Sequence, residues 1–244
     1  MIWFTSDLHF GHDREFVWKP RGYESCEEMN EFQVEKWNML VQDEDEVYVL
    51  GDLSLGPHTN IEKYVPRLKG KIHIILGNHD TYAREEIYKT LDNVVEVVPA
   101  ARLKYGKYNF FLTHYPCLTG NLEKEHLTQM TLNLYGHTHQ KTNFYEDRPY
   151  MYHCGVDSHD GYPVNIDTII YSMKNKVKEC EEYLEINDIV IDLEEKLDQL
   201  LKKLSKPTIR CSKCVYENTG CGHTDFDGNC KKYKRDAPDG GFYG

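Results

Sequence analysis

The stretch KIHIILGNHD, residues 71–80, decides the fold of this chain. From Ile72 onward it is mostly apolar and β-branched, and Gly77 ends the run before three polar side chains. A short apolar run bounded by glycine is typical of a strand that is buried on both faces. The polar residues after it would lie at the carboxyl end of the strand, where α/β sheets open toward a ligand.

Five other segments share this form and are also predicted to be strands. Each is short, apolar or β-branched, and ends at a polar residue or a glycine; they span residues 2–6, 47–51, 94–98, 108–113 and 132–136. A capping box at residues 25–28 begins a helix between the first two strands, and a second helix is expected around residues 84–91. The pattern predicts an α/β fold with late antiparallel character, because no comparable helix separates the strands after Tyr108.

Residues 172–206 have a different pattern, which is typical of a helical extension. Their apolar residues are spaced three and four apart in two sets, and the two sets are out of phase near Asn187 and Asp188. This predicts either two helices or one helix whose apolar seam shifts at that point. We expect the extension to pack on the preceding domain, with a dimerising coiled coil as the alternative, so the chain is expected to be a monomer or a dimer.

Length and charge indicate how the chain is divided. The net charge is -11 over 244 residues, but residues 202–235 carry +6 and the remainder -17, which argues against a broad footprint on duplex DNA. We expect a catalytic domain over residues 1–171, the helical extension, and a basic Cys-rich tail over residues 207–244. No apolar run is long enough to span a membrane and no basic leader precedes Ile2, so a cytoplasmic protein without membrane contact is expected.

Candidate ligands follow five of the predicted strands. They are Asp7 and His9; Asp52; Asn78, His79 and Asp80; His114; and His137 and His139. A single residue of this kind is more often a helix cap, a turn residue or a core histidine. Their coincidence at five strand ends instead indicates a site for two divalent ions, since mixed carboxylate and imidazole ligands suit Mn, Fe, Zn or Ni.

The motifs formed by these residues resemble those of a known family. D-x-H, G-D, G-N-H-D, H and G-H-x-H, in this order over residues 7–139, resemble the five motifs of the calcineurin-like metallophosphoesterases. The segments FTSDLHFGH and HCGVDSHDGYPVN are similar to a small bacterial and phage branch of that family. The resemblance implies a four-layered α/β/β/α sandwich with its site at the strand ends.

The resemblance also implies a role for each ligand. It assigns Asp7, His9 and His139 to one metal ion and Asn78, His114 and His137 to the other, with Asp52 as the bridge. It further implies that His79, polarised by Asp80, lies over the substrate phosphate. Four residues outside the motifs are weaker candidates, and a structural role is the alternative for each: His12 for the rim, Arg14 and Arg21 for a second phosphate group, and Asp157 for ordering the loop after the last motif.

The expected function is hydrolysis of a nucleotide-like or other small phosphoester by metal-activated water. The enzyme would be a phosphodiesterase or phosphatase with two divalent metal ions, with Mn expected first and Fe, Zn or Ni as alternatives. A nuclease with the same site, whose tail recruits nucleic acid, is a second hypothesis. A non-catalytic protein-binding scaffold is a third, and it is disfavoured because all seven metal ligands are present.

The tail carries four clustered cysteines that form a candidate zinc site. They are Cys211, Cys214, Cys221 and Cys230. Four thiolates would satisfy one tetrahedral structural zinc ion, and disulfides or redox-active thiols are the alternatives. With the basic charge around it, such a knuckle could bind nucleic acid or a partner protein, whereas a small cap that fixes the carboxyl terminus is equally consistent with the pattern.

Overall fold

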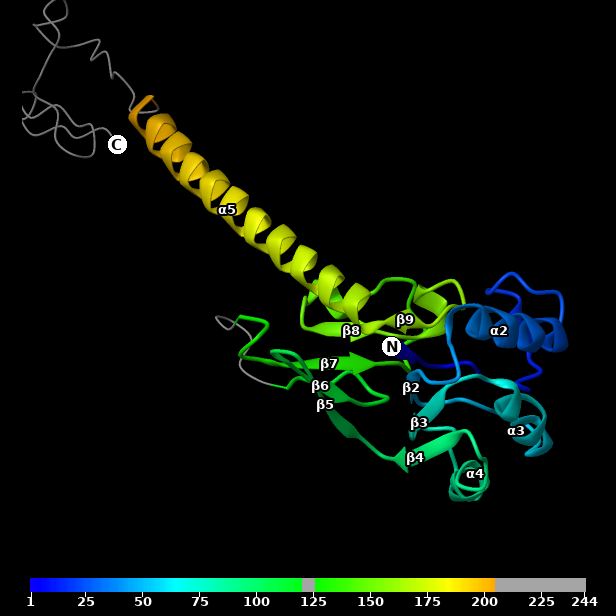
Figure 1. The fold of residues 1–244 in the computed structure, drawn as a ribbon. Helices are drawn as coiled ribbons and strands as arrows, with labels where there is room; N and C mark the ends of the chain where they lie inside the picture. The colour runs from blue at the N-terminus through cyan, green and yellow to red at the C-terminus, as the bar shows by residue number, and fades with distance from the viewer. Residues whose placement is uncertain (120–125, 205–244) are drawn as a thin grey trace, which may run out of the picture. The chain divides into compact units, whose positions relative to one another are not determined.

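The computed structural model describes residues 1–119 and 126–204 (Figure 1). The chain divides into two units, residues 1–180 and residues 181–244. The four tail cysteines lie outside the described residues, so the zinc site remains a prediction from the sequence. Among the described residues, no helix is both long enough and apolar enough to cross a membrane.

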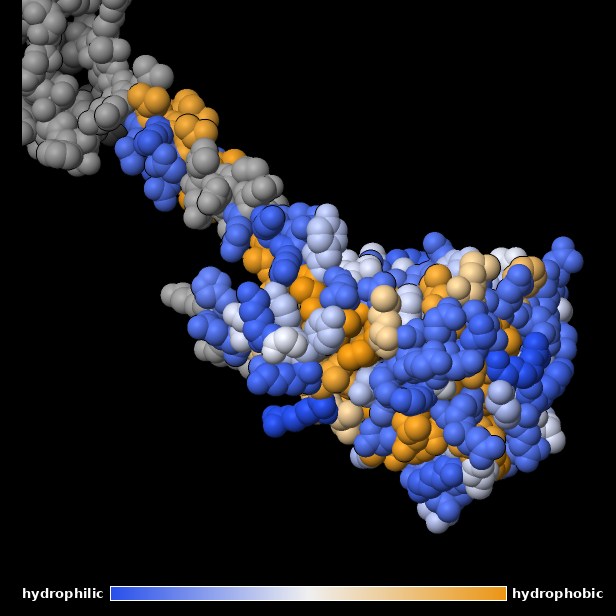
Figure 2. Space-filling view, viewed as in Figure 1, coloured by the Kyte–Doolittle hydropathy of each residue, from blue (hydrophilic) through white to orange (hydrophobic). Residues whose placement is uncertain are grey.

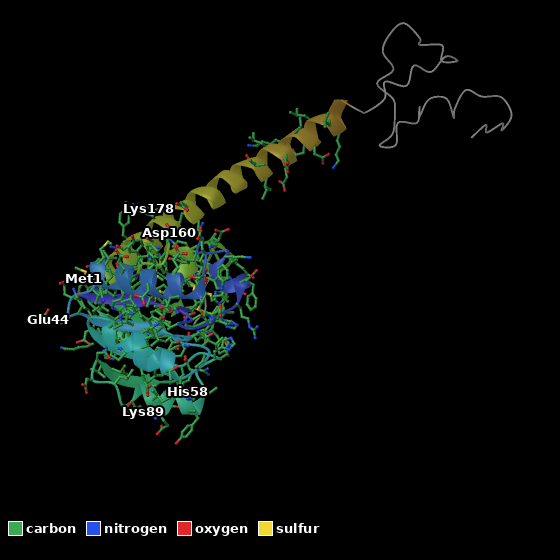
Figure 3. All side chains as sticks on the ribbon, turned by 90° about the vertical axis from the view of Figure 1, so that its right-hand side faces the viewer. Met1, Glu44, His58, Lys89, Asp160 and Lys178 are labelled. Atoms are coloured by element: carbon green, nitrogen blue, oxygen red, sulfur yellow. The ribbon has the colours of Figure 1, made fainter. Side chains whose placement is uncertain are left out.

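The first unit contains a five-stranded sheet whose strand order is β4-β3-β2-β1-β9. These strands are β1 (Ile2–Thr5), β2 (Glu46–Leu50), β3 (Lys71–Ile75), β4 (Val94–Val98) and β9 (Val164–Asn165). The first four are parallel, and β9 pairs with β1 in the antiparallel sense. Met1 and Glu44 lie at the amino ends of β1 and β2 (Figure 3), so the carboxyl ends of the parallel strands meet at the opposite edge.

Short helices make the crossovers between the parallel strands. They are α1 (Glu15–Trp18), α2 (Cys26–Leu40), α3 (Thr59–Tyr64) with the 3-10 turn Val65–Arg67, and α4 (Tyr82–Tyr88). The predicted cap of α2 is confirmed, since the Ser25 side chain accepts a hydrogen bond from the Glu28 N–H. In Figure 1, α2, α3 and α4 lie on the side of the sheet that faces away from the second sheet. They bury Trp37, Tyr64 and Tyr88 in a core shared with that face.

The second sheet has four strands in the order β5-β6-β7-β8. They are β5 (Ala101–Tyr105), β6 (Tyr108–Leu112), β7 (Thr131–Tyr135) and β8 (Met151–His153). Two short 3-10 turns, Tyr145–Asp147 and Val156–Ser158, flank β8. A second hydrophobic core joins the two sheets, with Phe4 and Leu50 from the first and Phe110 and Leu134 from the second. The two sheets with their helices confirm the predicted mixed α/β fold.

The expected antiparallel character after Tyr108 is only partly correct. The β5–β6 hairpin is antiparallel, but β6, β7 and β8 pair in parallel. The close spacing of the strands suggested hairpins because a parallel connection usually contains a helix. Here β6 and β7 are joined by a long connection, residues 113–130, whose described residues contain no helix.

The long helix α5 (Ile166–Leu204) is continuous and begins six residues before the predicted extension. A single helix therefore carries both apolar sets, and the predicted boundary between residues 171 and 172 falls inside it. Within the first unit, Ile166, Ile169, Ile170 and Met173 are buried in the core that joins the sheets. The start of α5 is therefore part of the first unit.

Within the second unit, α5 carries an exposed apolar strip. Val190, Leu193 and Leu197 are each more than two fifths exposed, as are Leu200 and Leu201. In Figure 2 the apolar and charged residues form separate strips along the last described turns of α5. Ion pairs four residues apart, Asp192–Lys196 and Asp198–Lys202, lie on the charged part of the helix. Such pairs stabilise an exposed helix by a few tenths of a kcal/mol each.

The burial of α5 predicts unequal effects of two neighbouring substitutions. Ile169→Ala should lower the free energy of unfolding by about 2–5 kcal/mol, because Ile169 is fully buried and its truncation leaves a cavity. Tyr171→Ala is the control, since Tyr171 is 67% exposed on the same turn, and it should change stability by less than about 1 kcal/mol. Urea unfolding followed by circular dichroism measures both values. Equal effects would contradict the packing of α5 into the first unit.

Candidate metal centre

The carboxyl ends of strands from both sheets bring the predicted ligands into one cluster. Two groups of side chains can each converge on a cation: Asp7, His9 and His139, and Asp7, Asp52 and His114. The first group is the ligand set predicted for one of the two metal ions. The second joins motifs from three strands and places Asp52 beside Asp7. Residues that follow β1, β2, β6 and β7 therefore lie in one cluster.

The first ligand set is tightly spaced. His139 Nε2 lies 3.3 Å from His9 Nε2 and 3.8 Å from Asp7 Oδ1, and His9 Nε2 lies 3.9 Å from the same oxygen. The other Asp7 oxygen, Oδ2, accepts hydrogen bonds from the Ser6 hydroxyl and the His137 N–H. Asp7 Oδ1 is buried and has no hydrogen-bond partner among the described residues. That oxygen is therefore free to bind a cation.

The second predicted set surrounds Asn78. Its Oδ1 lies 2.9 Å from both His114 Nε2 and His137 Nδ1. Asp52 Oδ2 lies 3.6 Å from His114 Nε2 and 3.8 Å from His9 Nε2, so this oxygen stands between the two sets. This position is consistent with the bridging role that the family resemblance implies for Asp52.

The proton of His114 shows why a cation fits this set. Its Nδ1 lies 2.8 Å from the Leu50 carbonyl oxygen, which can only accept a hydrogen bond. In the neutral ring Nδ1 therefore carries the proton, and Nε2 presents a lone pair. That lone pair faces Asn78 Oδ1 and Asp52 Oδ2, which are also acceptors. Three acceptor atoms that face one another are stabilised by a divalent cation.

The ligand loops are held in an unusual backbone conformation. Asp7, His9, Asp52, His137 and His139 all have φ between 48° and 69°, in the left-handed region. Non-glycine residues rarely adopt this region, and such strain is concentrated at functional sites. Hydrogen bonds from the Asp7 N–H to the Gly51 carbonyl and from the His9 N–H to the Asp52 carbonyl hold two of these loops side by side.

Burial sets the electrostatics of the site. It raises the pKa of Asp7, which has no exposed surface, and it lowers the pKa of His9 to about 2, with the Arg21 charge as a further cause. At His9 burial thus favours the neutral imidazole, and at Asp7 it penalises an uncompensated carboxylate, whereas the hydrogen bond to Asp157 raises the pKa of His139. A bound cation would reverse that penalty on Asp7, because an opposite charge stabilises the ionised carboxyl.

Comparison with known proteins agrees with this geometry. Residues 1–160 match the model of the calcineurin-like phosphoesterase superfamily domain. The chain belongs to the calcineurin-like phosphoesterase superfamily. The gene 66 protein of Mycobacterium phage D29 is 30% identical over 186 residues, which are 67% of this chain and 92% of the phage protein.

Two further proteins resemble this calcineurin-like phosphoesterase. An uncharacterized protein of Methanocaldococcus jannaschii is 28% identical over 180 residues, covering 69% of this chain and 89% of the relative. The crystal structure of a protein of unknown function from Aquifex aeolicus aligns with a TM-score of 0.54 and 20% identity, over 70% of this chain and 98% of that one. The structural likeness supports the fold.

The third motif of this calcineurin-like phosphoesterase, G-N-H-D, differs from the expectation in the contacts of Asp80. Asp80 Oδ2 accepts hydrogen bonds from the Gly77 and Asp52 N–H groups, and Oδ1 accepts one from the Tyr88 hydroxyl. Both oxygens are therefore occupied, and the described contacts of Asp80 do not include the His79 ring. These hydrogen bonds hold the Gly77 and Asp52 loops together, and the polarisation of His79 by Asp80 stays a prediction from the sequence.

His79 itself lies at the open side of the site. Its side chain is 44% exposed, and its Nε2 lies 3.9 Å from Asp52 Oδ2. The His12 ring lies 5.4 Å from the His9 ring and 6.5 Å from the His79 ring, between ring centroids. His12 therefore lies beside the predicted ligands, in agreement with the rim position that was one of its two alternatives.

Two residues that the sequence ranked low contact the centre directly. Asp157 Oδ2 lies 2.7 Å from His139 Nδ1, and Arg21 donates hydrogen bonds to both Asp157 oxygens. Although burial opposes it, the hydrogen bond from His139 and the Arg21 charge lower the pKa of Asp157. The segment GVDSHDG had indicated Asp157 only as a loop residue, because its partners lie 18 and 136 positions away.

The glycine before Asp52 offers a test of the site. Gly51 has φ +94°, and a Cβ built there would lie 2.2 Å from His114 Nδ1. Gly51→Ala should therefore displace His114 and reduce the bound Mn²⁺ per chain, measured by equilibrium dialysis and elemental analysis. Gly106→Ala is the matched control, because Gly106 has φ +55° and no described atom within 4 Å of a built Cβ. The control should lose about 1–2 kcal/mol of stability and keep its metal. Equal metal content in both variants would contradict the geometry.

Proposed function

We propose that this protein is a hydrolase of small, nucleotide-like phosphoesters that uses two divalent metal ions. The observation that carries the proposal is the position of Asp52 Oδ2, which lies within 4 Å of imidazole nitrogens from both ligand sets. The residues fit two cations, since each set presents carboxylate, imidazole or amide acceptors and Asp7 Oδ1 is buried without a partner among the described residues. When bound, two such cations neutralise charge on the phosphoryl oxygens and lower the pKa of the attacking water.

The residues of the chain have separate tasks in this proposal. One cation would be held by Asp7, His9 and His139. The other would be held by Asn78, His114 and His137. Asp52 would contribute to both sites. The half-exposed His79 ring can reach a phosphoryl group from the open side, where it would stabilise the transferring group or donate a proton to the leaving oxygen. Asp80 acts on the loops and not on the substrate.

Arg21 is removed from the candidates for a second phosphate group. Its Nε donates to Asp157, its Nη1 group contacts the Leu8 carbonyl and the Met29 sulfur, and its Nη2 group donates to Asp157 and to the Asp7 carbonyl. All five N–H groups of the guanidinium are thus engaged by the protein. A phosphate could bind Arg21 only by breaking one of these buried contacts.

Mn²⁺-dependent hydrolysis of bis-p-nitrophenyl phosphate tests the proposal. The full-length chain should be active with Mn²⁺ and inactive after chelation, and activity should return when the metal is restored. Asp52→Asn should abolish turnover, because it replaces the carboxylate that lies between the two ligand sets with a neutral amide. Activity that survives both chelation and Asp52→Asn would contradict the proposal.

His79→Ala should separate catalysis from metal binding. The variant should keep the metal content of the parent and lose about 10²- to 10⁴-fold in kcat, the range for removal of a group that acts on a proton or on charge in the transition state. His73→Ala is the control, because His73 is a partly buried histidine on β3 that contacts Glu46 and Glu96 outside the site. It should keep the kcat of the parent. Equal kcat values for both variants would remove His79 from the reaction.

The nuclease hypothesis uses the same chemistry and differs in how substrate is recruited. The tail that would recruit nucleic acid lies outside the described residues, so the distinction rests on experiment. Deletion of residues 207–244 should leave hydrolysis of the small ester unchanged if the substrate is a small phosphoester. Selective loss of activity on oligonucleotides would favour the nuclease. A panel of cyclic nucleotides, dinucleotides, nucleoside phosphates and short oligonucleotides then identifies the substrate class.

A further inference from the structure

A buried ion pair lies next to one of the two ligand sets. Arg21, in the turn after α1, and Asp157, in the 3-10 turn Val156–Ser158, are 136 positions apart, and their side chains are only 7% and 8% exposed. Arg21 Nε and Nη2 donate to the two Asp157 oxygens at 3.0 and 2.9 Å. This two-point geometry fixes the carboxylate in one orientation.

Each member of the pair also contacts the metal centre. Asp157 Oδ2 accepts a hydrogen bond from His139 Nδ1 at 2.7 Å. Arg21 donates to the main-chain carbonyls of Asp7, at 2.9 Å, and Leu8, at 3.3 Å. The pair thus joins the loop that carries Asp7 and His9 to the loop that carries His139. These are the three side chains of the first ligand set.

We propose that Asp157 and Arg21 are positioning residues that selectively increase the affinity for the metal ion held by Asp7, His9 and His139. This inference rests on the proposed function. Because Asp157 accepts the Nδ1 proton, His139 Nε2 keeps its lone pair and points at His9 and Asp7. A carboxylate behind a ligating histidine fixes its tautomer and ring orientation and raises its basicity toward the metal.

The second ligand set has a different support. The proton of His114 Nδ1 goes to the Leu50 carbonyl, which is neutral. A neutral acceptor fixes the tautomer but adds less negative charge behind the ring. The two metal ions should therefore differ in their dependence on outer partners, and loss of the Asp157 charge should weaken one of them and spare the other.

Arg21 lowers the free-energy cost of burying the Asp157 carboxylate. A carboxylate without exposure to water is costly unless it is paired and hydrogen-bonded, and Arg21 supplies both the charge and two of the bonds. Arg21 also anchors the backbone of Asp7, whose left-handed conformation requires outside support. The pair therefore acts on ligand geometry at two points without touching the substrate.

Asp157→Asn is the most direct test. An amide can replace only one of the two carboxylate oxygens as an acceptor, so its NH₂ group must face a donor from either Arg21 or His139. Asp157→Glu keeps the carboxylate and should restore part of the metal affinity. Asp45→Asn is the matched control, because Asp45 is also a buried carboxylate, paired with the N-terminal amine and Trp3 Nε1 at the amino end of the strands.

Mn²⁺ binding to the full-length, metal-stripped chains is measured by isothermal titration calorimetry and by electron paramagnetic resonance of free Mn²⁺. The parent and Asp45→Asn should each bind two ions. Asp157→Asn should bind one ion with the affinity of the parent and the other about 10- to 100-fold more weakly. Circular dichroism verifies that each variant is folded.

Two other results would overturn the inference. Binding of both ions by Asp157→Asn with the affinities of the parent would show that the pair does not support the metal, and equal weakening of both ions would show that its effect is not selective. A parent chain that binds fewer than two Mn²⁺ ions would instead overturn the proposed function. That failure appears in the parent before any variant is measured, so the two are distinguishable.

Discussion

A buried carboxylate with one free oxygen is the constraint on which the site depends. Asp7 has no exposed surface, burial raises its pKa, and its Oδ1 has no hydrogen-bond partner in the described parts of the chain. An ionised carboxylate in such a place is strongly unfavourable unless a positive charge compensates it. The His9 imidazole beside it supplies a lone pair and not charge, because burial lowers the pKa of His9. A divalent cation satisfies both requirements at once, and for this reason the ligands and the buried core can coexist.

The sheet holds the ligand loops in a conformation that they would not adopt alone. Asp7, His9 and Asp52 have positive φ, and each such residue costs of order 1–3 kcal/mol. Hydrogen bonds between the ends of neighbouring strands determine these conformations from both sides. Gly51, Gly77 and Gly136 complete the arrangement, since a Cβ at each would lie within 2.3 Å of His114, Asp52 or Ser6. The strand ends of the sheet thus fix the positions of Asp7, His9 and Asp52.

The sequence predicted the parts of this fold that depend on local patterns. All six predicted strands form, within two residues at each end, because apolar runs ended by glycine report burial directly. It missed β5, where exposed and partly buried residues alternate, and β8 and β9, which have three and two residues. The ligand positions followed from the strand ends, but the partners of Asp80 and Asp157 did not. The most distant of those partners are a backbone amide 28 positions from Asp80 and a guanidinium 136 positions from Asp157, and no local spacing reveals either.

The supports behind the ligands suggest why the two halves of the site need not be equivalent. His114 is fixed by a carbonyl at the end of β2, an element that the core holds in place regardless of charge. His139 is fixed by a side chain, Asp157, which depends in turn on Arg21 and on two loops. The contact that fixes His114 persists as long as the sheet is folded. The contact that fixes His139 depends on the ion pair between Asp157 and Arg21. Loss of the ion pair would therefore weaken the metal ion at the His139 side, and substitutions far from the substrate could tune its affinity without altering the sheet.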